Sequence, residues 1–171
     1  MKKIIHISAL FSVTAVLLAS CQGNGAIQGA VSAGANSEDC ATCESITRTI
    51  YNPNIGQSEV VPRFSTRRFV GLLQRGWVMP SPTSGPYLNH DFRFDTQDDT
   101  PDVLSVGPAA SNGSQIDVPV ILRFGPNGKP FKKIWVFFRE SGGWRVDDVV
   151  TSGHELESQN GSLANDLEKN A

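Results

Sequence analysis

Several features that would point directly to a function are scarce or absent in this chain of 171 residues. Three cysteines are too few for a small disulfide-built scaffold. Basic and acidic residues nearly balance, 15 against 17, so no overall positive field exists to attract nucleic acid, and no nucleic-acid partner is predicted. No nucleotide-binding glycine loop, H-E-x-x-H zinc motif or G-x-S-x-G nucleophile turn occurs. No apolar run reaches the roughly 20 residues that a membrane-spanning helix needs.

The longest apolar run lies at the N-terminus, where Lys2 and Lys3 precede residues 4–19, which carry no formal charge. A short positive region, an apolar core and then small residues are typical of a secretory signal peptide. The end of this run, Leu18-Ala19-Ser20-Cys21, resembles the lipobox of bacterial lipoproteins. The resemblance implies that residues 1–20 are removed and that Cys21 carries a covalent diacylglyceryl group and an N-acyl chain. An ordinary signal peptide with an incidental cysteine is the alternative.

The residue after the lipidated cysteine indicates where the protein is sorted. In enterobacterial sorting an aspartate there retains a lipoprotein in the inner membrane, and this chain has Gln22. The resemblance therefore implies a cell-envelope protein anchored in the outer membrane and facing the periplasm. Loss of Lys2 and Lys3 changes the formal net charge from −2 to −4, so we expect the acyl chains alone to provide membrane attachment.

Residues 21–43 are predicted to comprise the lipidated cysteine, a flexible Gly/Ala-rich linker and a C-x-x-C motif. In this motif Cys43 is followed by Glu44, which excludes haem attachment because that requires histidine. A thioredoxin-type redox pair and a zinc site stay open as less favoured alternatives. Because lipidation of Cys21 leaves two thiols in an oxidising compartment, we favour a disulfide between Cys40 and Cys43.

Residues 44–171 are predicted to form a single α+β domain. Apolar spacing and capping residues predict a helix over 44–52, a helix that starts after Ser65 and stops at Gly76, and a short C-terminal helix over Ser162–Lys169. Alternating or continuous apolar residues predict strands over 102–106, 116–124, 130–139 and 144–150, and short turns join the last three as an antiparallel meander. Pro119 inside the second strand predicts an edge or a bulge there.

The order of these segments resembles an uncharacterised bacterial family called domain of unknown function 3828. The residues that carry the resemblance are the helix motif Phe64-Ser65-x-x-x-Phe69-x-x-Leu72-Leu73 and the tail Gly143-Trp144-Arg145-Val146-Asp147-Asp148-Val149. The resemblance implies the cone-shaped fold of nuclear transport factor 2-like proteins, in which N-terminal helices pack on a curved antiparallel sheet. It also implies a pocket between helices and sheet. The family has no established activity, so it supplies no catalytic residues.

Two carboxylate sites are candidates for chemistry near such a pocket. Strict alternation places Trp144, Val146 and Asp148 on one face of the last strand. An inward Asp148 would act as an acid or base, with Trp135 and Trp144 as further pocket candidates. The favoured alternative is that Asp148 binds an arginine or a backbone N–H at the rim of the sheet. His90 beside Asp91 is a weak candidate for a general base.

No metal or other cofactor is predicted. The acidic run from Asp95 to Asp102 lacks the calcium-loop pattern, so solvated or capping carboxylates are favoured over an ion site. The basic residues of the third strand are expected to be solubilising charges at its two ends: Lys129, Lys132, Lys133 and Arg139.

Taken together, these patterns favour a non-enzymatic envelope lipoprotein whose domain binds a protein or a small ligand in the periplasm. One version is an immunity-like protein that blocks a toxin delivered by a neighbouring cell. The alternative is a pocket enzyme, an isomerase or hydrolase of small substrates.

Overall fold

The sheet in the second half of the chain follows from the alternation of apolar and polar residues. The computed structural model describes residues 35–80, 88–96, 100–154 and 160–170. Within these ranges the chain forms four helices and one open antiparallel sheet of six strands, which confirms the predicted α+β class. The strand order is β1-β3-β4-β5-β6, and β2 pairs with β3 beside β1. The strands are β1 (Asp102–Val106), β2 (Ala110–Asn112), β3 (Gln115–Arg123), β4 (Phe131–Glu140), β5 (Gly143–Ser152) and β6 (Gly161–Ser162).

Strand β3 lies inside the sheet, between β4 and the pair β1 and β2. Its alternate residues Ile116, Val118, Val120 and Leu122 are fully buried, while the residues between them are partly exposed. The predicted period of two is therefore confirmed, and it fixes which face of the strand meets the core.

Pro119 was expected at an edge or a bulge, but it stands in the middle of this interior strand. The Pro119 carbonyl accepts a hydrogen bond from Gly107 N, which lies on the side of β3 where β1 and β2 pair. The Pro119 nitrogen faces that side too. On that side β1 has ended at Val106 and β2 begins only at Ala110. The proline therefore sits at a gap between two short strands, where its missing N–H removes no ladder bond.

A bulge between β4 and β5 changes the predicted faces of β5. Val136 pairs with Asp148, but the next residue of β4, Phe137, pairs with Val146. After Val146, the next buried residue of β5 is consequently Val149, and Asp148 between them is only partly buried. The prediction that Asp148 shares the inner face with Trp144 and Val146 is wrong, because the extra residue of a bulge breaks strict alternation.

Two helices differ in extent from the predictions. Helix α1 (Ser37–Ile50) begins before residue 44 because Asn36 and Asp39 form a capping box, in which each side chain accepts from the other residue's backbone N–H. The C-x-x-C motif therefore lies inside α1, and both cysteines are buried in the core. Helix α2 (Gln57–Phe64) was not predicted, since Pro62 lies within it and interior proline disfavours helix.

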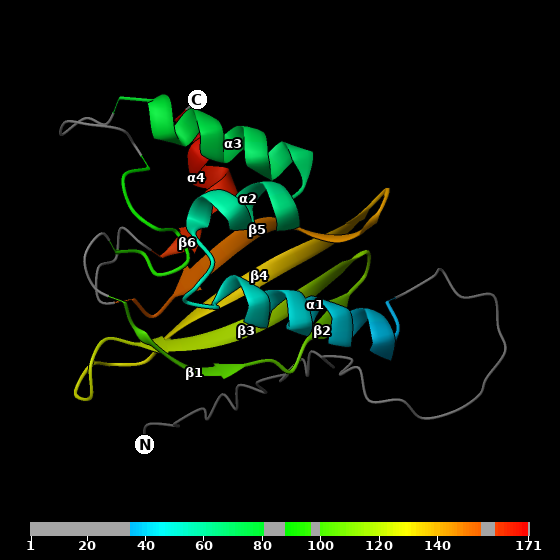
Figure 1. Cartoon of the computed structure of the whole chain (residues 1–171), viewed down its shortest axis with the longest axis horizontal. Helices are drawn as coiled ribbons and strands as arrows, with labels where there is room; N and C mark the ends of the chain where they lie inside the picture. The colour runs from blue at the N-terminus through cyan, green and yellow to red at the C-terminus, as the bar shows by residue number, and fades with distance from the viewer. Residues whose placement is uncertain (1–34, 81–87, 97–99, 155–159, 171) are drawn as a thin grey trace, which may run out of the picture.

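The remaining two helices start at polar caps. Helix α3 (Arg67–Val78) begins one residue later than expected, because the Thr66 side chain rather than that of Ser65 accepts from Phe69 N. Helix α4 (Leu163–Lys169) is capped by Ser162, as predicted. Helix α1 lies across the sheet over β3, while α2, α3 and α4 lie toward β5 (Figure 1). No helix among the described residues is long and apolar enough to cross a bilayer.

Gly76 was expected to stop α3, but it lies within the helix, where α3 meets α4. Its carbonyl accepts a hydrogen bond from Leu88 N, and Leu167 of α4 packs against its Cα. A Cβ at this position would stand 2.6 Å from Leu167 Cδ2 and 3.2 Å from Leu88 Cβ. The glycine therefore permits a close approach of three segments.

We predict that Gly76→Ala lowers the free energy of unfolding by about 1–3 kcal/mol, because the added methyl group overpacks this contact. Gly71→Ala on the same helix is the matched control, since its nearest neighbour would be an Arg75 nitrogen at 3.7 Å. The control should be neutral or slightly stabilising. Urea unfolding of both variants measures the difference, and equal midpoints would contradict the proposed contact.

Candidate functional site

The candidate site is built around a lysine in the core. Lys133 of β4 has a side chain that is 1% exposed, and its Nζ lies 2.6 Å from Asp95 Oδ2. It also donates to the Phe92 carbonyl at 2.9 Å and to Thr151 Oγ1 at 3.0 Å. Three acceptors thus occupy the three protons of one ammonium group. The arrangement ties the segment between α3 and β1, described here as residues 88–96, to β4 and β5.

Burial of this charge is possible only because a partner is present. Desolvation lowers the pKa of Lys133, and the carboxylate of Asp95 opposes that shift. Asp95 also accepts from Thr151 Oγ1 at 3.1 Å. Its backbone has φ of 57°, a left-handed conformation that aspartate tolerates better than most residues. The turn of the segment at Asp95 is therefore held by its side chain.

A second ion pair fixes the same segment to the helices. Arg93 Nε lies 3.0 Å from Asp91 Oδ1, and the other guanidinium nitrogens bind Asp91 Oδ2 and two backbone carbonyls. Those carbonyls belong to Ile50 and Ile55, at the end of α1 and just before α2. Both carboxylate oxygens of Asp91 are thus engaged by Arg93, and the two charges compensate each other.

His90 lies next to these pairs and is partly exposed. Its Nε2 is 4.0 Å from Asp95 Oδ1, and its Nδ1 is 3.4 Å from Asn89 Oδ1. Burial lowers the pKa of His90, although the nearby Asp95 opposes this, so the imidazole is neutral at pH 7. The carboxylate that faces His90 is therefore Asp95, whereas the sequence suggested the adjacent Asp91, which Arg93 holds.

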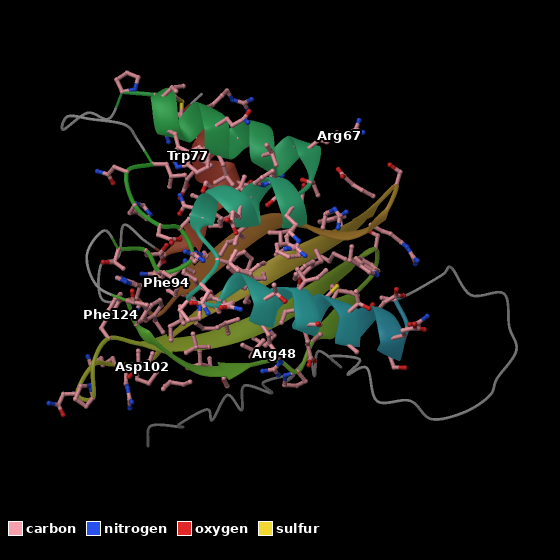
Figure 2. The ribbon with its side chains drawn as sticks, viewed as in Figure 1. Arg48, Arg67, Trp77, Phe94, Asp102 and Phe124 are labelled. Atoms are coloured by element: carbon pink, nitrogen blue, oxygen red, sulfur yellow. The ribbon has the colours of Figure 1, made fainter. Side chains whose placement is uncertain are left out.

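An open cavity of about 500 Å³ lies on one side of the segment. Its lining is contributed by α2, α3 and the segment: Gln57, Trp77, Leu88, Asn89, His90 and Asp91. We call it the α2–α3 cavity. Trp77 lies on the side of α3 that faces α2 and the segment (Figure 2). Its indole nitrogen makes no hydrogen bond with another described residue.

A second cavity of about 430 Å³ lies on the other side of the segment, toward β1. Phe94 and Asp102 lie along its wall (Figure 2). Tyr51 forms its floor, and the Tyr51 hydroxyl donates to Arg93 O and accepts from Trp135 Nε1. The segment thus contributes to the lining of both hollows.

The predicted pocket residues do not line these cavities. Trp135 is 1% exposed, and it serves the core by donating to Tyr51. Trp144 is also buried, and its Nε1 donates to Asp39 Oδ1 at 2.7 Å, which helps to lower the pKa of Asp39. Both tryptophans therefore tie α1 to the sheet.

The carboxylate of Asp148 binds the N-terminus of α4. Its carboxylate accepts from Ser162 Oγ at 2.6 Å, from Ala164 N at 2.9 Å and from Val149 N at 2.7 Å. Burial raises the pKa of Asp148, while these hydrogen bonds act in the opposite direction. The geometry is that of a carboxylate bound to backbone N–H groups at the rim of the sheet, the alternative favoured from the sequence.

The predicted disulfide between Cys40 and Cys43 is absent, because Cys43 is a free, fully buried thiol. The motif lies in regular helix, where side chains three residues apart have Cβ atoms about 5–6 Å apart. A disulfide requires a separation of about 3.5–4.5 Å. Burial raises the pKa of Cys43 to about 12, so the free thiol is not a nucleophile at neutral pH.

The sequence interpretation missed Lys133, Asp95 and Trp77 as neighbours of the site. Lys133 was assigned to solubilising surface charge, yet the alternation of Phe131, Lys133 and Trp135 along β4 already placed it inside. The acidic run is divided: Asp95 pairs with Lys133, and positions 97–99 lie outside the described residues. Among the described residues no three His, Cys, Asp or Glu side chains gather as a metal site.

We compared the chain with protein-family models, with curated proteins and with solved structures, and none of them matches it.

We predict that Lys133→Met lowers the free energy of unfolding by about 3–5 kcal/mol, because Asp95 would remain buried without its partner. Lys132→Met is the matched control, since Lys132 is the adjacent, exposed residue of β4 and its loss should cost less than about 0.5 kcal/mol. Chemical denaturation of both variants tests this. A small effect at position 133 would mean that the buried pair contributes little.

Proposed function

We propose that this protein is a lipid-anchored protein of the bacterial cell envelope whose domain binds a small ligand in the α2–α3 cavity. The observation that carries the proposal is the lining of that cavity, where the aromatic side chain of Trp77 and several polar side chains border one hollow. Small-molecule sites combine apolar surface with a few fixed polar groups in this way. The segment supplies four of the six described lining residues. Arg93 and Lys133 hold this segment in place, so the wall is pre-formed.

The anchor is proposed from the lipobox that ends at Cys21. Lipid on Cys21 and the Gly/Ala-rich linker up to α1 would keep the domain near a membrane surface. With Gln22 as the following residue, we place the anchor in the outer membrane and the domain in the periplasm.

The finer fold assignment is also a proposal. An antiparallel sheet with its helices packed against it agrees with a nuclear transport factor 2-like cone and with the resemblance to domain of unknown function 3828. Bulges in the β1–β3 and β4–β5 pairs favour a strongly twisted sheet, which a cone requires. A cone would place the core side of β4 opposite α1, and Trp135 bonded to Tyr51 fits that position.

Binding is favoured over catalysis because three described groups that could act as nucleophiles are either engaged or buried. The Lys133 ammonium has three acceptors and no exposure, and the Cys43 thiol is buried. Asp148 holds the N-terminus of α4.

One observation favours a second candidate function, a pocket enzyme that uses His90 as a general base. His90 lines the cavity, and its Nε2 lies 4.0 Å from Asp95 Oδ1. An imidazole with a carboxylate near one nitrogen is the arrangement of a general base with its orienting group.

We predict that Cys21→Ala abolishes incorporation of labelled palmitate and moves the protein from the membrane to the soluble fraction, because the acyl chains are its only anchor. Ser20→Ala is the control, since it keeps a small residue before the cysteine and should leave both results unchanged. Membrane retention of Cys21→Ala without label would refute the anchor.

We predict that the wild-type protein retains a low-molecular-weight compound from envelope extract and that Trp77→Ala loses it, because the indole forms one wall of the cavity. Val78→Ala is the matched control, since Val78 is the next residue of α3, is 80% exposed and does not line the cavity. Native mass spectrometry of the three proteins provides the comparison. Equal adducts on all three, or none on the wild type, would contradict binding in this cavity.

Incubation of the protein with the retained compound distinguishes the binding function from the enzymatic one. A binding protein returns the compound unchanged after prolonged incubation, and His90→Gln alters only its affinity. An enzyme converts the compound, and His90→Gln stops the conversion.

A further inference from the structure

The charges at the wall of the α2–α3 cavity are compensated within the protein. Asp91 is neutralised by Arg93, and Asp95 is neutralised by Lys133. Burial lowers the pKa of His90 from its ordinary value, which favours the neutral imidazole at pH 7. Among the described residues, the other lining side chains are two amides, an indole and a leucine. A ligand with a net charge would therefore lose its hydration without gaining an opposite charge at this wall.

The polar atoms left over at this wall are mainly donors. Gln57 Oε1 accepts from Phe92 N, which leaves its amide N–H groups without a partner among the described residues. The Asn89 amide nitrogen and the Trp77 indole nitrogen likewise bind no described residue. The residues that carry these N–H groups belong to three separate parts of the chain and line one hollow. A ligand with several uncharged acceptor oxygens would offer them partners.

The aromatic face adds a requirement on shape. Trp77 is partly exposed at the cavity, so one part of its ring system remains to be covered. Indole combines an apolar face with a polar N–H edge, and it is best covered by a flat group that is apolar on its face and polar at its rim. A pyranose ring has this form, with C–H bonds on its face and hydroxyl or acetamido oxygens around its edge.

From this combination we infer that the α2–α3 cavity binds an uncharged saccharide, with one sugar ring against Trp77 and its oxygens on the amides of Gln57 and Asn89. The inference rests on the proposed binding function. The cavity is open to solvent, so the sugars on either side of the bound ring extend outward. A glycan chain is thus accommodated as well as a single sugar.

The test is isothermal titration of the purified full-length protein in detergent with three probes: the N-acetylglucosamine trimer, maltotriose and cellotriose. At least one trisaccharide should bind, and Trp77→Ala should weaken it by about tenfold or more, which corresponds to about 1.4 kcal/mol. Trp77→Phe should keep part of the affinity because a ring remains, and Val78→Ala should match the wild type. Urea unfolding of each variant establishes that the variants are folded.

Two charged probes, succinate and spermidine, complete the design. Binding of either of them through Trp77 while all trisaccharides fail would overturn the saccharide inference and leave the proposed binding function intact. A second result would also overturn the saccharide inference and leave the proposed binding function intact. In that result no probe binds, but the protein retains a sugar-free compound from envelope extract through Trp77. Failure of every probe and of the extract would overturn both. Saccharide binding that Trp77→Ala does not weaken would place the sugar elsewhere and overturn the inference.

Discussion

The ammonium group of Lys133 lies in the core, and its three protons reach acceptors in different parts of the fold. Phe92 and Asp95 belong to the segment between α3 and β1, and Thr151 belongs to β5. A buried charge cannot be left without partners, because its desolvation costs several kcal/mol. The lysine therefore allows only one position for this segment on the sheet. The walls of both cavities depend on that position, since the segment lines both of them.

Under the proposed function, the same pairing determines what the site would recognise. Because Asp95 faces Lys133 and Asp91 faces Arg93, the three charged groups of the segment and the lysine of β4 form two pairs that carry no net charge. Fixed, paired charges hold the backbone rigidly, and the remaining donors are uncharged amide and indole N–H groups. A rigid wall loses little conformational entropy when a ligand binds. Selectivity then comes from the placement of hydrogen bonds and from one aromatic face rather than from long-range attraction.

Local patterns in the sequence predicted what depends on local physics. The alternation of β3 and the Ser162 cap of α4 were found because each follows from neighbouring residues. Asp148 was misplaced because a bulge depends on the pairing of two strands, which no single strand reveals. The pairing of Lys133 with Asp95 joins residues far apart in the chain. The alternation of β4 gave a usable signal for it, namely that a lysine occupied an inward position between two buried aromatic residues.

Under the proposed function, the anchor compensates for the modest affinity that such a wall provides. An open cavity without free charge excludes little water, and a single sugar ring gains only a few hydrogen bonds and one stacking contact there. Lipid on Cys21 would confine many copies of the domain to one surface, within the reach of a short linker. A long glycan near that surface would meet several copies at once, and linked weak contacts add up to strong retention. Neutral walls are then an advantage, because each contact stays weak and reversible while the array as a whole holds the polymer.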